Sequence, residues 1–217
     1  MNTPSVGVLV SVRTNSRRLP AKAFLPISGK PSCLFLLDRL KDGLNFPLHI
    51  ATTSDWSDNY LSAFLENHGY SVYRGSNENV FERLLELSKA SNFDYLVRIT
   101  ADCPFLDSTL VNDLIDQAFD NPGWILATTK GVHPAGLDIE ILSVHEMSQV
   151  ASKLSDYDKE HVTSFFYSHL PSENIFTLRH PKLSVQTGVF LLDTIEDFIS
   201  LNEFIDSNGG TFSTVRH

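Results

Sequence analysis

An apolar run near the start of the chain is followed directly by a cluster of positive charge. Residues 6–12 are rich in valine and lack regular polar alternation, which predicts a strand buried on both faces of a parallel sheet. The loop at the carboxyl end of this strand carries four cations, Arg13, Arg17, Arg18 and Lys22. Ligands of open α/β sheets bind at this edge, and cations beside free backbone N–H groups suit a polyphosphate. A basic loop in contact with solvent is the alternative that the charges leave open.

The size and charge of the chain exclude several classes of protein. Its 217 residues, 42% of them hydrophobic, are enough for one substantial domain, and we expect a single domain over residues 1–217. The net charge of −9 argues against binding to a nucleic acid polymer, although a small anionic ligand can still occupy a local basic pocket. No apolar run is long enough to span a membrane, and the first residues lack a signal-peptide pattern. We therefore expect a cytoplasmic protein without membrane contact.

Strands and helices alternate through the first half of the chain. Beyond the opening strand, apolar runs predict strands at residues 48–52, 71–73 and 94–100. Helices are predicted between them from capping residues and apolar faces, with starts near Pro31, Asp58, Asn79 and Asp107. This order predicts an α/β fold in which helices cover both faces of a parallel sheet.

The second half of the chain is less regular. Strands are predicted at residues 124–128, 137–142, 175–178 and 189–192. Helices are predicted after Ser143, over residues 160–170, and from Asp193 or Thr194 onward. No internal repeat or linker interrupts these elements, so the irregular half is expected to belong to the same domain.

Acidic residues fall at the ends of predicted strands at three places. Asp102 follows the strand at 94–100, a position typical of a carboxylate that binds Mg²⁺ together with phosphate oxygens; a turn residue is the alternative. Asp138 and Glu140 are two apart on one predicted strand and therefore face the same side, which is also the pattern of a solvent-facing edge. Asp193 precedes a predicted helix, where it fits both an N-cap and a metal ligand.

A series of motifs resembles one enzyme family. The loop after the first strand resembles the signature of the cytidylyltransferases that activate acidic sugars, through Arg13, Ser16, Arg18, Leu19, Pro20, Ala21 and Lys22. This family includes the CMP-Kdo and CMP-sialic acid synthetases, and the likeness is strongest to the branch named for a spore-coat polysaccharide biosynthesis protein. Further blocks follow in the family's order at residues 51–54, 74–83, 98–104, 136–140, 160–163 and 193–197.

The resemblance implies a fold and a reaction. The fold is the three-layer α/β/α Rossmann-like fold of nucleotide-diphospho-sugar transferases, with a mostly parallel central sheet. The reaction is attack by a sugar hydroxyl on the α-phosphorus of CTP, which gives a CMP-sugar and pyrophosphate for surface polysaccharide biosynthesis. The cofactor implied is Mg²⁺, and the assembly implied is a homodimer.

The resemblance also implies a set of site residues, carried over by position. Catalytic roles fall on Arg13, Lys22 and Asp102. Contacts to CTP fall on those three residues and on Ser16, Arg18, Thr52 and Arg74. The sugar side is implied at Asp138, Glu140 and His161, and the Mg²⁺ site at Asp102 and Asp193. A structural histidine is the alternative for His161.

Two departures from the family pattern keep other hypotheses open. Ala21 stands where the family has glycine, and its side chain is strained if the position requires a positive φ. The last block aligns in two ways, which make either Asp193 or Gln186 the second metal residue. The first further hypothesis is a nucleotidyltransferase of the same fold that joins UTP or another NTP to a sugar-1-phosphate. The second is a nucleotide-sugar-binding module without turnover.

Overall fold

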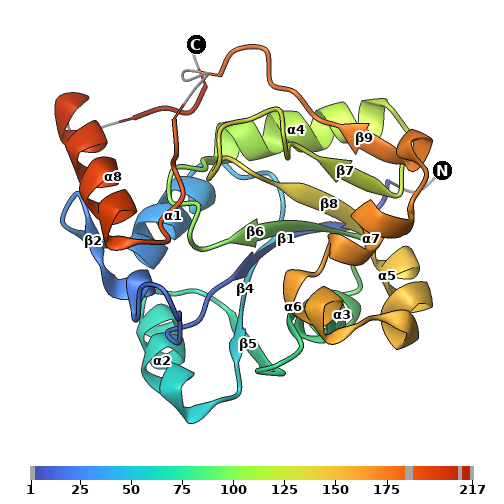
Figure 1. Ribbon diagram of the computed structural model, residues 1–217, viewed down its shortest axis with the longest axis horizontal. Helices are drawn as coiled ribbons and strands as arrows, with labels where there is room; N and C mark the ends of the chain where they lie inside the picture. The colour runs from blue at the N-terminus through green and yellow to red at the C-terminus, as the bar shows by residue number, and fades with distance from the viewer. Residues whose placement is uncertain (1–2, 184–187, 210–211, 216–217) are drawn as a thin grey trace.

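A seven-stranded sheet runs through the centre of the computed structural model, which describes residues 3–183, 188–209 and 212–215 (Figure 1). Its order is β5-β4-β1-β6-β8-β7-β9, and β8 runs antiparallel to both of its neighbours while the other pairs are parallel. The strands are β1 (Val6–Ser11), β4 (Leu48–Thr53), β5 (Val72–Gly75), β6 (Tyr95–Thr100), β7 (Leu126–Thr128), β8 (Glu140–Ser143) and β9 (Ile175–Thr177). A separate ribbon pairs β2 (Pro26–Ile27) with β3 (Lys30–Pro31). The predicted, mostly parallel α/β fold is confirmed.

Helices cover both faces of the sheet, which gives three layers (Figure 1). One face packs against α1 (Ser32–Lys41), α2 (Asn59–Asn67), α4 (Ser108–Asp120) and α8 (Ile195–Ser207). The other face packs against α3 (Val80–Ala90), α5 (Val144–Val150) and α7 (Ser164–His169), and α6 (Asp156–His161) lies against α3. Successive residues of β1, such as Val8 and Leu9, enter opposite cores, which explains the unbroken apolar run. Within the described residues, no helix has the length and apolar character needed to cross a bilayer.

Three elements in the second half differ from the sequence prediction. The helix predicted over 160–170 is two short helices, α6 and α7, which are separated at Val162. The strand predicted at 137–142 begins only at Glu140. The segment predicted as a strand at 189–192 makes a single bridge, between Ala135 and Val189. Each error lies where the chain leaves the regular sheet.

A strained turn separates α6 from α7. Val162 adopts φ 48° and ψ −58°, and the Thr163 N–H donates across it to the carbonyl of His161, which is the geometry of a γ-turn. A β-branched residue rarely adopts positive φ. Val162 is fully buried in the core beneath α3, and this packing holds the turn in place. The turn directs the end of α6 toward the cavity and Thr163 toward β8.

Candidate active site

A cavity of about 560 Å³ opens at the carboxyl ends of β1 and β6. Its walls come from the loop after β1, from α3, from the end of α6 and from the segment before α8. The cations that line it are Arg13, Arg17, Arg18, Lys22, Arg83 and Arg98. The carboxylates that line it are Asp102, Glu160 and Asp193. This local excess of positive charge, in a chain of net charge −9, suits an anionic ligand.

The basic loop (residues 13–22) is held by a buried carboxylate. Asp58 is 1% exposed, and its Oδ1 accepts hydrogen bonds from the backbone N–H and the hydroxyl of Thr14, at 2.8 and 2.7 Å. Its Oδ2 accepts the hydroxyls of Thr52 and Thr53. Burial raises the pKa of Asp58, but these hydrogen bonds outweigh burial and hold the pKa below its usual value. The sequence predicts Asp58 as the cap of α2, but its side chain makes no capping bond and instead fixes the basic loop.

Two of the predicted CTP contacts lie outside the cavity. Thr52 is fully buried and donates its hydroxyl to Asp58 at 3.1 Å. Arg74 donates from Nε to the Thr53 carbonyl at 2.9 Å and from a terminal nitrogen to the Asp55 carbonyl at 2.8 Å. Both side chains therefore support the turn that carries Asp58. They affect the cavity only indirectly, because Asp58 holds the basic loop.

Lys22 joins two carboxylates inside the cavity. Its Nζ lies 2.9 Å from Asp102 Oδ2 and 3.3 Å from Asp193 Oδ1. Its backbone carbonyl accepts the buried Ser32 hydroxyl of α1 at 2.7 Å, which fixes the base of the side chain. Arg18 forms a second ion pair with Asp193. Burial raises the pKa of Asp102, but the charge of Lys22, together with hydrogen bonds from Thr100 and Lys22 and the charge of Arg98, holds the pKa below its usual value.

Asp193 faces Lys22 because its neighbour caps the following helix. The Thr194 hydroxyl accepts from the N–H of Asp197, and the Asp197 carboxylate accepts from the N–H groups of Asp193 and Thr194, at 3.0 and 2.8 Å. This capping box satisfies the start of α8 without the Asp193 side chain. Gln186, the alternative metal residue, lies outside the described residues.

The segment that carries Asp193 is positioned through its backbone. The Leu192 N–H donates to the Asp102 carbonyl at 2.8 Å, so a hydrogen bond links the chain beside both acidic residues. The Phe190 N–H donates at 2.7 Å to the carbonyl that precedes Gly136. A Cβ at Gly136 would lie 2.1 Å from the carbonyl carbon of Phe190. Only glycine allows this close approach.

Asp102 and Asp193 form a donor set that fits a hard divalent cation. Both carboxylates already converge on one positive atom, the Nζ of Lys22. Mg²⁺ commonly takes one or two protein carboxylates and completes its octahedron with phosphate oxygens and water. Among the described residues, no group of three or more His, Cys, Asp or Glu side chains could hold a metal. The pair therefore suits a cation that binds together with a polyphosphate.

The residues predicted on the sugar side lie in three different environments. His161 lines the cavity, and its ring centroid is 4.2 Å from that of Tyr157. Glu140 is 4% exposed, and its carboxylate accepts three hydrogen bonds from neighbouring side chains, so the alternative of a solvent-facing edge is wrong for this residue. Asp138 is partly buried just before β8, and burial raises its pKa. His161 alone of the three lines the cavity.

Two cations of the cavity, Arg83 and Arg98, have no role assigned by the sequence. Arg83 on α3 is 2% exposed and donates to the Ser76 carbonyl at 2.8 Å. Burial and the charge of Arg13 lower the pKa of Arg83 to about 10. A sequence signal exists for both: each arginine interrupts an apolar pattern, Arg83 on the buried face of a helix and Arg98 inside a buried strand. A cation at such a place needs a partner.

Ala21 adopts the left-handed conformation, with φ 56° and ψ 23°, so this position does require a positive φ. We expect Ala21→Gly to raise the free energy of unfolding by up to about 1 kcal/mol, because glycine removes the Cβ strain while its freedom in the unfolded chain offsets part of the gain. Urea denaturation measures the change. Ala63→Gly on the exposed face of α2 is the control and should cost about 1 kcal/mol. A loss of stability in Ala21→Gly would contradict the strain.

Comparison with known proteins identifies the family of this chain. The family model described as cytidylyltransferase matches residues 7–190. This chain belongs to the cytidylyltransferase family. The cytidylyltransferase is 26% identical over 212 residues to the spore coat polysaccharide biosynthesis protein SpsF of Bacillus subtilis, a match that covers 93% of this chain and 86% of that protein.

Solved structures share the fold of this cytidylyltransferase. A cytidylyltransferase from Leptospira borgpetersenii superposes with a TM-score of 0.83 at 27% identity, over 99% of this chain and 100% of the other. A CMP-2-keto-3-deoxy-manno-octonic acid synthetase complexed with CTP superposes with a TM-score of 0.71 at 17% identity, over 94% and 99% of the two chains. The expected nucleotide-sugar transferase fold is therefore confirmed.

Proposed function

We propose that this cytidylyltransferase transfers CMP from CTP to a hydroxyl group of an acidic sugar and releases pyrophosphate. The observation that carries the proposal is the convergence of Lys22, Asp102 and Asp193 at one end of a cavity lined by the basic loop. The relative in Bacillus subtilis is named for spore coat polysaccharide biosynthesis, which supports a role for the product in surface polysaccharide assembly.

Charge neutralisation is the main demand of this reaction. The sugar oxygen forms a bond to the α-phosphorus while the bond to pyrophosphate breaks, and negative charge develops on the leaving group. Lys22 and Arg18 are preorganised donors at the point where that charge would appear. The ion pair of Arg13 with Glu160, at 3.1 Å, joins partly exposed side chains and is therefore weak enough to exchange for phosphate oxygens. Ser16 in the same loop supplies a hydroxyl donor to the cavity.

The role of the acidic pair is to hold Mg²⁺. Asp102 and Asp193 would bind the cation, which when bound neutralises phosphate charge and orients the reacting hydroxyl. Lys22 occupies the space between the two carboxylates and keeps them paired without the metal. His161, which also lines the cavity, would contact the sugar.

Thermal unfolding with CTP, UTP, ATP and GTP, each with and without Mg²⁺, tests the proposal. A ligand at a hundred times its Kd stabilises the native protein by about 2.7 kcal/mol. We expect CTP to give the largest rise in Tm and Mg²⁺ to increase it. A preference for UTP would favour transfer to a sugar-1-phosphate. The absence of a shift with every nucleotide would contradict the proposal.

A further inference from the structure

Three buried polar atoms of residues that line the cavity have no hydrogen-bond partner in the described part of the chain. They are Ser11 Oγ on β1, Arg83 Nε on α3 and Arg98 Nε on β6. An arginine Nε–H can only donate, so two of these three groups lack an acceptor atom. A buried donor without a partner is costly to leave unsatisfied. The cavity therefore holds two arginines, apart from the basic loop, whose donors the described protein atoms do not all satisfy.

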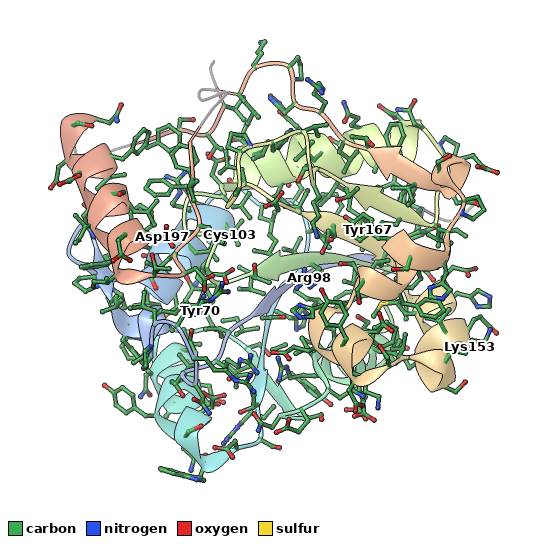
Figure 2. All side chains as sticks on the ribbon, viewed as in Figure 1. Tyr70, Arg98, Cys103, Lys153, Tyr167 and Asp197 are labelled. Carbon is green, nitrogen blue, oxygen red and sulfur yellow. The ribbon has the colours of Figure 1, made fainter. Side chains whose placement is uncertain are left out.

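Arg98 is the more rigidly oriented of the two arginines. One of its terminal nitrogens donates to Glu140 Oε2 at 2.6 Å. The other oxygen of Glu140 accepts the hydroxyls of Thr163 and Tyr167, at 2.8 and 3.0 Å. Arg98 on β6 and Tyr167 on α7 lie on neighbouring elements (Figure 2). The network holds the guanidinium from one side, and the Arg98 side chain stays 20% exposed where it lines the cavity.

The position of Arg98 separates it from the basic loop. It precedes Thr100 by two residues on β6, so its side chain leaves the same face of the strand roughly 6–7 Å deeper. Arg98 and Asp102 line the same cavity. The triphosphate has its own cations in the basic loop. Arg98 is therefore placed for an acidic group of the acceptor, close to the acidic pair.

We propose that Arg98 is a specificity-determining residue that binds the carboxylate of an acidic acceptor sugar, and that Glu140 is its positioning residue. The inference rests on the proposed function, because it requires the nucleotide to occupy the basic loop. The proposal changes the role of Glu140 from a predicted contact to the sugar to a residue that orients Arg98. This carboxylate does not line the cavity, and it acts on the acceptor only through Arg98.

The experiment compares a charged acceptor with its neutral analogue on the full chain. The probes are 3-deoxy-manno-octulosonate and N-acetylneuraminate, each beside its carboxamide, in the presence of Mg²⁺ and a CTP analogue with a methylene bridge between the α- and β-phosphorus. We expect the wild-type protein to bind at least one carboxylate ten times or more tightly than its amide. Arg98→Gln should weaken carboxylate binding about 10- to 100-fold, abolish the preference and leave nucleotide affinity unchanged.

Matched variants separate recognition from folding. Arg179→Gln removes an exposed arginine away from the cavity and should leave every affinity unchanged. Because Arg98→Gln leaves a buried carboxylate without its cation, the double variant Arg98→Gln with Glu140→Gln removes both charges together. Glu140→Gln alone should reduce the ratio of carboxylate to amide affinity, a readout that a general loss of stability does not move.

The possible outcomes separate the role of Arg98 from the proposed reaction with CTP. Nucleotide binding without a preference for either carboxylate in the wild-type protein would overturn the role of Arg98 and leave the nucleotide reaction standing. A preference that persists in Arg98→Gln would do the same. Failure of the wild-type protein to bind the nucleotide analogue would overturn the proposed function together with this inference.

Discussion

Lys22→Met is expected to lower kcat/KM by at least about a hundredfold, because it removes a preorganised charged donor from the transition state. The Lys22 side chain is 17% exposed and contacts both carboxylates of the acidic pair, so solvent cannot replace it in the same geometry. Pyrophosphate release with CTP and an acidic sugar measures the loss. Lys153→Met is the matched control and should keep normal turnover, because Lys153 is exposed, lies just before α6 and does not line the cavity (Figure 2).

The metal affinity of the same variant gives a second signature. In the nucleotide-free protein Lys22 competes with a divalent cation for Asp102 and Asp193, so Lys22→Met should bind Mg²⁺ at least as tightly as the wild-type protein. Asp102→Asn should also lose about a hundredfold or more in kcat/KM, but it should bind Mg²⁺ more weakly because a ligand is lost. Equal turnover in the wild-type protein and either variant would show that the roles are assigned to the wrong residues.

Asp58→Ala is expected to cost about 2–4 kcal/mol of folding free energy and to impair catalysis indirectly. The substitution leaves the half-buried donors of Thr14 and the buried donors of Thr52 and Thr53 without an acceptor, and each unsatisfied donor destabilises the fold. It also frees the basic loop, which should raise the KM for CTP. Urea denaturation measures the stability. Asp116→Ala on the exposed face of α4 should change it little.

The pH dependence of stability provides a further check on Asp58. Hydrogen bonds hold its pKa in the folded protein below the value in the unfolded chain. Its contribution is therefore present above the unfolded pKa and is lost as the pH falls through the folded pKa. The stability difference between the wild-type protein and Asp58→Ala should shrink as the pH is lowered from about 5 to 2. A constant difference would mean that the carboxylate charge does not matter.

The sequence predicts the first half of the fold well because local signals and burial agree there. Strands β1, β4 and β6 are largely buried, and each is a mainly apolar run that ends in a polar turn. The edge strand β5 is half-buried and is the shortest of the four. The break at Val162 has no local signal, since valine is among the residues least suited to positive φ. Tertiary packing decides that turn. The segment at 189–192 fails as a strand for a similar reason, because hydrogen bonds to the loop at 135 and to Asp102 position it.

The candidate site, like the fold, can be predicted from the sequence only in part. Lys22 and Asp102 come close because they follow β1 and β6, which end at the same edge of the sheet, and this is visible from the sequence. Asp193 follows no strand, and backbone hydrogen bonds of the preceding segment bring it to the same place. Thr52 and Arg74 end neighbouring strands on the same edge, but their side chains are taken up by Asp58 and by backbone carbonyls. Which strand-end residues face the ligand depends on those partners. Spacing along the chain does not reveal them.

Gly136 carries no functional group, yet the location of one acidic residue depends on it. The backbone of Phe190 passes so close that any side chain at 136 would push this strip of chain outward. Asp193 lies three residues further along the same strip and would move with it. A substitution at Gly136 would therefore produce the phenotype of a damaged acidic pair in a protein whose chemical groups are all intact. The absence of a side chain at Gly136 is therefore as necessary to the position of Asp193 as any of the charges around it.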